Sequence, residues 1–340
     1  FIAPFIGLLW LVRVFAVEAA MRARCLLHER SFDGPPDGAA KVSIVLAGKD
    51  EEANIEACVR SLLDQDYPNY ELIVVDDRST DSTPEILGRL AKEYQDRLRI
   101  LRITSLPPGW FGKHNAIRTG MEAASGEWLL FTDADCRQTS RRTLSLAMSE
   151  ALHHQSDFLS VIPNLERRTF WERVLQPVCA AILMVWFRPA RVNNPACPAA
   201  YANGAFMLMS RECYNAIGGH EAVRDKINED IHMADLAKQR GQRLRVVENQ
   251  GLYVARMYDS LLAGFHGWSR IFYGCLERPS RIATAFLLVL LSGVFPWVSL
   301  LIAFSGALVT HDPIWWKSTA VWGVVVALIQ LVTARLYSAV

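Results

Sequence analysis

The sequence lacks the cysteine patterns that hold disulfide frameworks and zinc sites. Its seven cysteines are Cys25, Cys58, Cys136, Cys179, Cys197, Cys213 and Cys275, and they contain no CxxC pair. An odd, scattered set of this kind is typical of reduced thiols rather than of a secreted scaffold or a structural zinc site. We therefore expect free thiols, as in the cytosol.

An excess of charge of either sign is also absent. Lys and Arg number 36 and Asp and Glu 35, a net charge of +1, so no global field favours nucleic acid or an acidic partner. Apolar residues make up 51% and charged residues 21% of the 340 residues. This composition is too apolar for an average soluble domain and too charged for a wholly membrane-embedded chain, which indicates a segmented protein.

Charge is missing altogether from one long stretch, 284–309, which exceeds the roughly 20 residues needed to cross a bilayer. Segment 314–334 carries a single Lys and begins near two tryptophans, as at a membrane interface. Segment 1–17 is apolar apart from Arg13 and is predicted to span, the alternative being a buried amphipathic helix. We expect about three spans. Because the chain begins with Phe rather than Met, residues are expected to precede it.

Positive charge flanks these segments on one side. Arginines follow the first segment, precede the second and follow the third, whereas the 310–317 loop holds only Lys317. The positive-inside rule therefore places the middle of the chain in the cytoplasm. We predict a transmembrane helix with its basic flank at 1–30, a linker at 31–40, a catalytic domain at 41–275 and two membrane helices at 276–340.

The middle region alternates strand and helix patterns. Strands are predicted at 42–48, 70–77, 98–103 and 127–135, and helices at 51–65, 84–95 and 113–124. Apolar strands that alternate with helices predict an α/β fold with a mostly parallel sheet. Ligands of such sheets bind beyond the carboxyl ends of the strands.

Acidic residues end two of these strands: Asp76 and Asp77 follow IVV, and Asp133 and Asp135 follow LLFT. Any one of them could be a helix cap or turn residue. A D-x-D pair can also hold a hard cation, Mg²⁺ or Mn²⁺, that neutralises a leaving diphosphate. The glycine loops GxxxxGK[ST] and GxGxxG are absent, so metal and side chains would have to hold the phosphates.

Four blocks of residues, in order, resemble the inverting family 2 glycosyltransferases of GT-A fold. They are VSIVLAGKDEEANIEACVRSLLDQDYPNYELIVVDDRSTDST (42–83), PGWFGKHNAIRTG (108–120), TDADC (132–136) and the region 202–241 that contains NED. The resemblance implies a mostly parallel GT-A domain flanked by transmembrane helices. It also implies a nucleotide-sugar donor, a UDP-sugar in the first instance, and Mg²⁺ or Mn²⁺.

The roles that the resemblance implies follow position by position. Asp50 and Glu51 would lie beside the nucleoside, and Asp76 or Asp77 would contact base and ribose. Lys113 would reach the diphosphate. Asp133 would face the nucleotide and, with Asp135, hold the metal. Asp230, next to Glu229 in NED, would be the general base that deprotonates the acceptor hydroxyl, which single displacement requires. By itself Asp230 could equally be a surface helix residue.

The Q-x-x-R-W motif of processive relatives is absent. The corresponding stretch, 265–274, contains Trp268 and Arg270 without a Gln or an Arg-Trp pair. Arg270 could bind the diphosphate and Trp268 lie in the leaving-group region, or both could be juxtamembrane residues. Transfer of one sugar to one acceptor is therefore favoured over a processive polysaccharide synthase. A catalytically inactive nucleotide-sugar binder is a further alternative.

An uncharged run at 174–187 is too short to span and predicts either an interfacial or a core helix. The flanking spans hold the site at the bilayer, which favours a lipid acceptor. Region 202–241 also resembles non-processive relatives that act on ceramide, carotenoids and hopanoids. His220 could contact donor or acceptor or be a turn residue. The sugar, the metal preferred in the cell and the oligomeric state are not encoded by any motif.

Overall fold

The computed structural model describes residues 2–339, which divide into two compact units. We call residues 24–173 and 184–267 the α/β unit, and residues up to 23, 174–183 and from 268 the helical unit. The terminal residues of the first and last predicted membrane segments, 1 and 340, lie outside the described residues.

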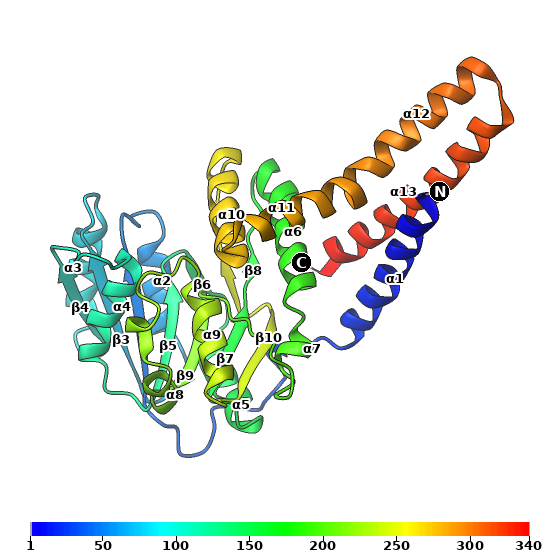
Figure 1. Cartoon of the computed structure of the whole chain (residues 1–340). Helices are drawn as coiled ribbons and strands as arrows, with labels where there is room; N and C mark the ends of the chain where they lie inside the picture. The colour runs from blue at the N-terminus through cyan, green and yellow to red at the C-terminus, as the bar shows by residue number, and fades with distance from the viewer. Residues whose placement is uncertain (1, 340) are drawn as a thin grey trace. The chain divides into compact units, whose positions relative to one another are not determined.

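The α/β unit is built on an eight-stranded sheet with the order β1-β10-β7-β9-β5-β2-β3-β4 (Figure 1). Its strands are β1 (Leu26–His28), β2 (Val42–Gly48), β3 (Tyr70–Asp77), β4 (Leu98–Ile103), β5 (Trp128–Asp133), β7 (Phe158–Ile162), β9 (Phe206–Ser210) and β10 (Leu244–Gln250). All neighbours pair in parallel except β9, which is antiparallel to β5 and β7. The predicted mostly parallel α/β fold is thus confirmed.

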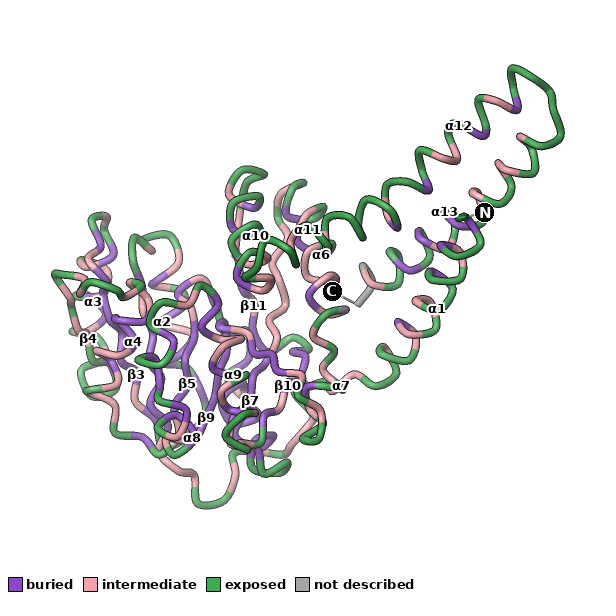
Figure 2. The backbone as a smooth tube through the Cα atoms, viewed as in Figure 1, coloured by how far each residue is buried: buried purple, intermediate pink, exposed green. Residues whose placement is uncertain are grey.

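Helices accompany the sheet as the alternating pattern predicts. They are α2 (Ile55–Leu63), α3 (Thr83–Glu93), α4 (Gly112–Ala123), α5 (Thr143–His153), α8 (Arg211–Ala216) and α9 (Glu229–Gln239). Alternate residues of β2 serve different cores: Val42, Ile44 and Leu46 pack in one buried cluster and Val45 in another. Because side chains alternate across a strand, both faces of β2 are buried, as Figure 2 shows for the central strands.

Two differences from the predicted bounds affect the residues at the sheet edge; the other bounds agree to within two residues. Residues 51–54, predicted to be helical, precede α2 as a turn. The predicted strand 127–135 ends at Asp133, and Cys136 begins β6 (Cys136–Gln138) in a second sheet with the order β6-β11-β8. Strands β8 (Asn164–Leu165) and β11 (Tyr253–Ala255) complete that sheet. The break in the strand leaves the D-x-D segment in a turn between the two sheets.

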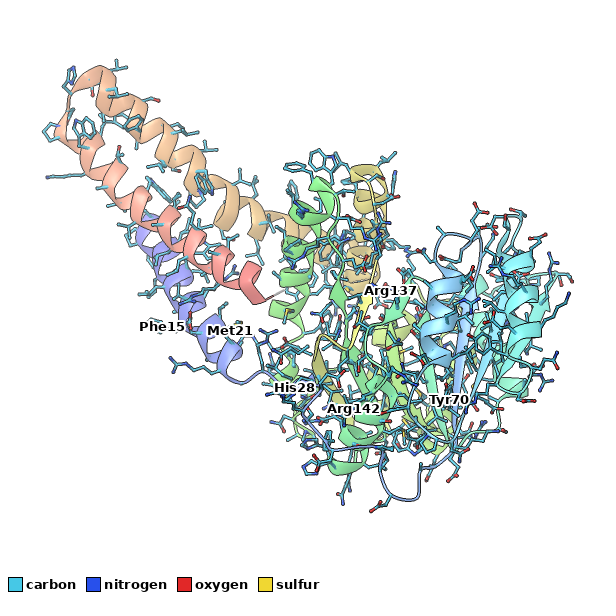
Figure 3. All side chains as sticks on the ribbon, turned by 180° about the vertical axis from the view of Figure 1, so that it is seen from behind. Phe15, Met21, His28, Tyr70, Arg137 and Arg142 are labelled. Carbon is cyan, nitrogen blue, oxygen red and sulfur yellow. The ribbon has the colours of Figure 1, made fainter. Side chains whose placement is uncertain are left out.

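The segment after the first predicted span contributes a strand to the large sheet. Strand β1, within the stretch assigned from sequence to the basic flank, pairs with β10, and Arg24 forms an ion pair with Glu248. Residues 31–40, the predicted linker, contain no helix or strand. Arg142 at the start of α5 donates to the carbonyls of Glu29 and Phe32, each at 2.6 Å (Figure 3). These bonds hold the segment that follows β1 against the start of α5.

In the helical unit, α1 (Ala3–Arg22) packs against α13 (Pro313–Ala339) through a small apolar cluster that includes Ile6 and Val325. Pro296, near the start of α12 (Phe295–Thr310), has no N–H for the carbonyl of Ser292 four residues earlier. The indole of Trp10 donates to that carbonyl at 2.9 Å. A buried aromatic side chain of α1 therefore supports the helix at a point where a backbone donor is missing.

Among residues 2–339, four helices are long and apolar enough to cross a membrane: Ala3–Arg22, Phe170–Val192, Pro279–Thr310 and Pro313–Leu336. Three match the predicted spans. The fourth, Phe170–Val192, contains the run 174–187 and reaches 23 residues because it joins α6 (Phe170–Trp186) to the short helix α7 (Pro189–Val192). By length this segment could span, contrary to the prediction from the run alone. Many apolar side chains of the four helices are exposed, as Phe15 is in Figure 3. Exposed apolar surface on this scale is typical of lipid contact.

Candidate active site

The carboxyl ends of β2, β3 and β5 lie side by side at one edge of the large sheet. Gly48, at the end of β2, is opposite Asp76 of β3, and Ala47 is opposite Asp133 of β5. This is the edge at which α/β sheets bind ligands. The acids predicted at two strand ends are therefore brought to one edge.

Hydrogen bonds join the turn after β2 to the turn after β3. Asp50 has φ of 55°, a left-handed conformation uncommon for a non-glycine residue. Its N–H donates to Ser79 Oγ at 2.9 Å, and its carboxylate accepts from the Thr80 N–H at 2.7 Å. The N–H of Glu51 donates to Thr83 Oγ1 at 2.8 Å. Asp50 thus shapes this edge, and its predicted contact with a nucleoside stays a prediction.

Both acids that end β3 are buried and face arginines. Asp76 Oδ2 lies 3.1 Å from Arg102 Nε, and Asp77 accepts from Arg78 Nε at 2.7 Å. The start of α4 lies against Asp77, because a Cβ on Gly112 would come within 2.3 Å of Asp77 Oδ2. The choice between Asp76 and Asp77 as the nucleoside contact stays open.

The D-x-D segment holds two acids at the end of β5. Asp133 closes the strand, and Asp135 follows in the turn, where its carbonyl accepts from the Arg256 N–H at 3.1 Å. Burial raises the pKa of Asp135 to about 7, and the negative charges of Asp133 and Glu51 add to the effect. Three acids therefore converge here.

These acids fit a divalent cation whose coordination a substrate completes. Within residues 2–339, no group of three or more His, Cys, Asp or Glu side chains is arranged as a complete metal site. Carboxylate oxygens are nevertheless the ligands that Mg²⁺ and Mn²⁺ prefer, and Mg²⁺ is commonly held by one or two carboxylates together with substrate phosphates. Asp133 and Asp135 provide such a pair.

Lys113, in the first turn of α4, links the D-x-D segment to the start of α9. Its Nζ lies 2.6 Å from Asp133 Oδ1 and 2.7 Å from Glu229 Oε1. Burial acts to lower the pKa of Lys113, but the charges of Asp133 and Glu229 outweigh it and hold the pKa well above its usual value. The ammonium is therefore charged, and its third N–H can serve another acceptor.

Asp230, the predicted general base, lies beside Glu229 in the first turn of α9. Its Oδ2 accepts from the Gly204 N–H at 2.8 Å and its Oδ1 from the Ile231 N–H at 2.8 Å. Burial raises the pKa of Asp230 to about 7, and the charge of Glu229 raises it further, while Lys113 acts in the opposite direction. A carboxylate with this pKa can both take and release a proton near neutral pH.

Gly204 lies where these groups meet. A Cβ on Gly204 would be 3.3 Å from Lys113 Nζ, 3.5 Å from Asp230 Oδ2 and 3.6 Å from Glu229 Oε1. The segment before β9 therefore approaches all three charged side chains closely. Sequence reasoning did not single out Gly204, although it lies within the region 202–241 that carries part of the family resemblance.

Two buried histidines lie next to this cluster. His114, which follows Lys113 and was not singled out from sequence, lies 3.4 Å from Glu229 through Nε2. His220 lies in a short 3₁₀ turn (Gly219–Glu221), fully buried, with Nδ1 3.1 Å from the Tyr214 hydroxyl. Burial lowers the pKa of His220 to about 3, so its ring is neutral. Only the GKH context of His114 could have drawn attention to it.

Trp268 and Arg270 lie on α10 (Leu261–Leu276), in the part that belongs to the helical unit. The α/β unit brings together the other predicted site residues at or near one sheet edge. The predicted roles of Trp268 and Arg270 near a leaving group stay predictions.

Known proteins resemble this chain in sequence and in fold. Residues 43–218, more than half of the chain, match Glycosyl transferase family 2. A Beta-monoglucosyldiacylglycerol synthase of Nostoc sp. is 31% identical over 193 residues, which cover 55% of this chain and 40% of that protein. The match thus spans less than half of that relative. A 4,4'-diaponeurosporenoate glycosyltransferase of Staphylococcus aureus is 23% identical over 300 residues, 84% of this chain and 76% of that protein.

Among solved structures, a mannosyltransferase from Pyrobaculum calidifontis in complex with GDP-Man and Mn2+ superposes with a TM-score of 0.58 at 20% identity. The match covers 96% of this chain and 97% of that one and shows the same GT-A type of fold. The family match, the ordered acids and this fold lead to one conclusion: the chain is a member of glycosyl transferase family 2.

Proposed function

We propose that the protein is a membrane-bound inverting glycosyltransferase that moves a sugar from a nucleotide-sugar donor to a hydroxyl of a lipid. The observation that carries this proposal is the Lys113 bridge, which joins the D-x-D acids through Asp133 to the start of α9, where Asp230 lies. One side chain, Lys113, thus connects the acids proposed to bind the donor with the helix start that carries the proposed base. A UDP-sugar is the first donor to test.

On the donor side, the third N–H of Lys113 would bind a diphosphate oxygen, while the ammonium remains paired with Asp133 and Glu229. Asp133 and Asp135 would hold Mg²⁺ or Mn²⁺, which, when bound, neutralises charge on the leaving diphosphate. Asp50, Glu51 and one of Asp76 and Asp77 would face the nucleoside at the ends of β2 and β3.

On the acceptor side, Asp230 would take the proton of the attacking hydroxyl. The two backbone N–H groups that it accepts from fix the carboxylate, and both oxygens keep a further lone pair. The hydroxyl oxygen forms the bond to the anomeric carbon as the bond to the diphosphate breaks, and its proton passes to Asp230. Attack opposite the leaving group inverts the anomeric centre.

The α/β unit itself offers an apolar surface suited to a bilayer. At the starts of α6 and α10, Phe170, Leu262 and Phe265 are 68%, 67% and 64% exposed. Thr169 Oγ1 donates to the carbonyl of Asp259 at 3.3 Å, which joins these two helix starts. Such a surface supports a lipid acceptor, and two of the relatives bear the names of lipid glycosyltransferases. The absence of Q-x-x-R-W supports the transfer of single sugars.

The excess of arginine on one side of the predicted spans supports a cytoplasmic catalytic unit in a membrane with three or four spans. A cysteine placed at the 310–317 loop and another at 31–40 would test this orientation. Only the first should react with an impermeant maleimide on intact cells, and the reverse labelling pattern would contradict the proposal.

Isothermal titration of the detergent-solubilised protein with UDP and GDP, each with and without Mn²⁺ or Mg²⁺, tests the donor. We expect binding of one nucleotide that depends on the metal. Its sugar conjugates would then be offered with diacylglycerol in phosphatidylcholine vesicles, and the product would be analysed by mass spectrometry. One sugar per lipid is expected, a ladder of sugars would indicate a processive synthase, and binding without turnover of any acceptor would favour an inactive binder.

A further inference from the structure

Glu229 bridges two consecutive residues of the first turn of α4. One carboxylate oxygen lies 2.7 Å from Lys113 Nζ, and the other lies 3.4 Å from His114 Nε2. The side chain of Glu229 is only 8% exposed. Burial acts to raise its pKa, but Lys113 and His114 outweigh this and hold the pKa below its usual value. Glu229 is therefore a fixed negative charge between the two helix starts.

His114 is itself anchored on its other side. Its Nδ1 lies 3.2 Å from the carbonyl of Arg224, which also accepts from the Phe111 N–H at 3.0 Å. The ring of His114 thus lies between the Arg224 carbonyl on its Nδ1 side and the Glu229 carboxylate on its Nε2 side. The loop before α9 therefore holds the start of α4 by two bonds, in addition to the Glu229 bridge.

This arrangement decides where two chemically important groups lie. The ammonium of Lys113 lies between two carboxylates, that of Asp133 and that of Glu229. Asp230 is in the first turn of α9, directly after Glu229. The charged side chains that act on Asp230 are Glu229 of its own helix and Lys113 of α4, and two backbone N–H groups bind it. Glu229 thus acts on both groups.

We propose that Glu229, supported by His114, is a positioning residue that sets the place of the Lys113 ammonium and the proton affinity of Asp230. The proposal rests on the proposed role of Asp230 as the general base. It assigns Glu229 no contact with donor, metal or acceptor. The charge of Glu229 contributes to the raised pKa of Asp230, which agrees with a role of Glu229 in setting the proton affinity of Asp230.

Replacement of Glu229 by Gln tests it, because the side chain keeps its shape and loses its charge. The acid limb of the kcat–pH profile should move to lower pH by about 1 unit, since a like charge next to Asp230 is removed. At pH 8 kcat should fall about tenfold, because Asp230 is a weaker base and Lys113 loses one of its two anchors. Metal-dependent nucleotide binding should weaken by no more than about threefold, because Asp133 and Asp135 are unchanged and Asp133 still holds Lys113.

Glu229→Asp separates charge from geometry. It keeps the charge, so the acid limb should stay near the wild-type position, while the shorter side chain reaches Lys113 less well and kcat falls. His114→Gln should lower kcat without moving the acid limb. Glu212→Gln, an exposed position on α8, is the matched control and should behave as wild type in all three readouts.

An acid limb that does not move in Glu229→Gln, or that moves to higher pH, overturns the proposal. Should that variant fail to fold, Glu229→Asp decides: an acid limb displaced by 1 unit, or an unchanged kcat, contradicts the proposal. Asp230→Asn in the same series distinguishes failure of the proposed function from failure of the positioning role alone. If Asp230→Asn turns over normally, the proposed function fails; if it is inactive and Glu229→Gln resembles wild type, only the positioning role fails.

Discussion

Asp230→Asn replaces the proposed base with a side chain of nearly the same shape that cannot accept a proton. Asp230 accepts from the N–H groups of Gly204 and Ile231, each at 2.8 Å. Asn has one acceptor oxygen, so one of these N–H groups would face an NH₂ donor instead, at a cost of about 1–3 kcal/mol. The fold should survive this loss, and donor binding should be retained because Lys113 and Asp135 are untouched.

The effect on turnover follows from the loss of general base catalysis, which contributes about 10²–10⁴-fold. We expect kcat to fall by at least about 100-fold at pH 8. The wild-type enzyme should itself lose activity as the pH falls below about 7, because its base has a pKa raised to about 7 and is protonated there. In Asp230→Asn the residual rate should lack this acid limb.

Stability should respond in the opposite direction to activity. The pKa of Asp230 is raised from an ordinary 3.8 to about 7, so the folded protein binds this proton more tightly than the unfolded chain. The stability that this proton contributes is present below pH 4 and is lost as the pH rises to 7. The full shift corresponds to about 4 kcal/mol, and screening of the half-buried carboxylate reduces this to about 2 kcal/mol.

Asn does not titrate, so the stability of the variant relative to wild type should increase by about 2 kcal/mol between pH 4 and pH 8, or about 4 °C in Tm. Differential scanning fluorimetry in detergent at several pH values measures this difference, with product mass spectrometry as the activity assay. A Tm difference that is flat with pH would refute the electrostatic reasoning. Near-normal turnover would refute the assignment of the base.

Three further outcomes are expected. Asp135→Ala should abolish metal-dependent nucleotide binding in titration calorimetry, and unchanged affinity would exclude Asp135 from the metal site. Gly112→Ala should lower Tm and weaken nucleotide binding, since its Cβ would lie 2.3 Å from Asp77 Oδ2. Gly88→Ala, inside α3 where a Cβ meets nothing within 4 Å, should instead raise Tm slightly, because Ala favours a helix over Gly, and should leave nucleotide binding unchanged. Trp10→Phe should lower Tm by the equivalent of about 1 kcal/mol, because the carbonyl of Ser292 loses its indole donor; an unchanged Tm would show that another donor replaces it.

Much of the α/β unit could be predicted because its signals are local. Strands 42–48, 70–77 and 98–103 have the predicted bounds, since each is a continuous apolar run between turn residues. Residues 51–54 were wrongly assigned to a helix. Tertiary hydrogen bonds hold this segment in a turn instead. The N–H groups of Asp50 and Glu51 donate to side chains in the turn after β3, about thirty residues away.

Asp133 and Asp135 could be named from sequence because a D-x-D pair at a strand end is visible in the chain itself. The sequence by itself also determined the order of the strands and helices between 42 and 133, and three of the four described helices that are long enough for a membrane. Only the tertiary structure decided that Lys113 is shared between Asp133 and Glu229, and that Gly204 approaches both helix starts. These residues are up to 116 positions apart, and which charged groups meet depends on how α4 and α9 pack on the sheet, which local preference does not encode.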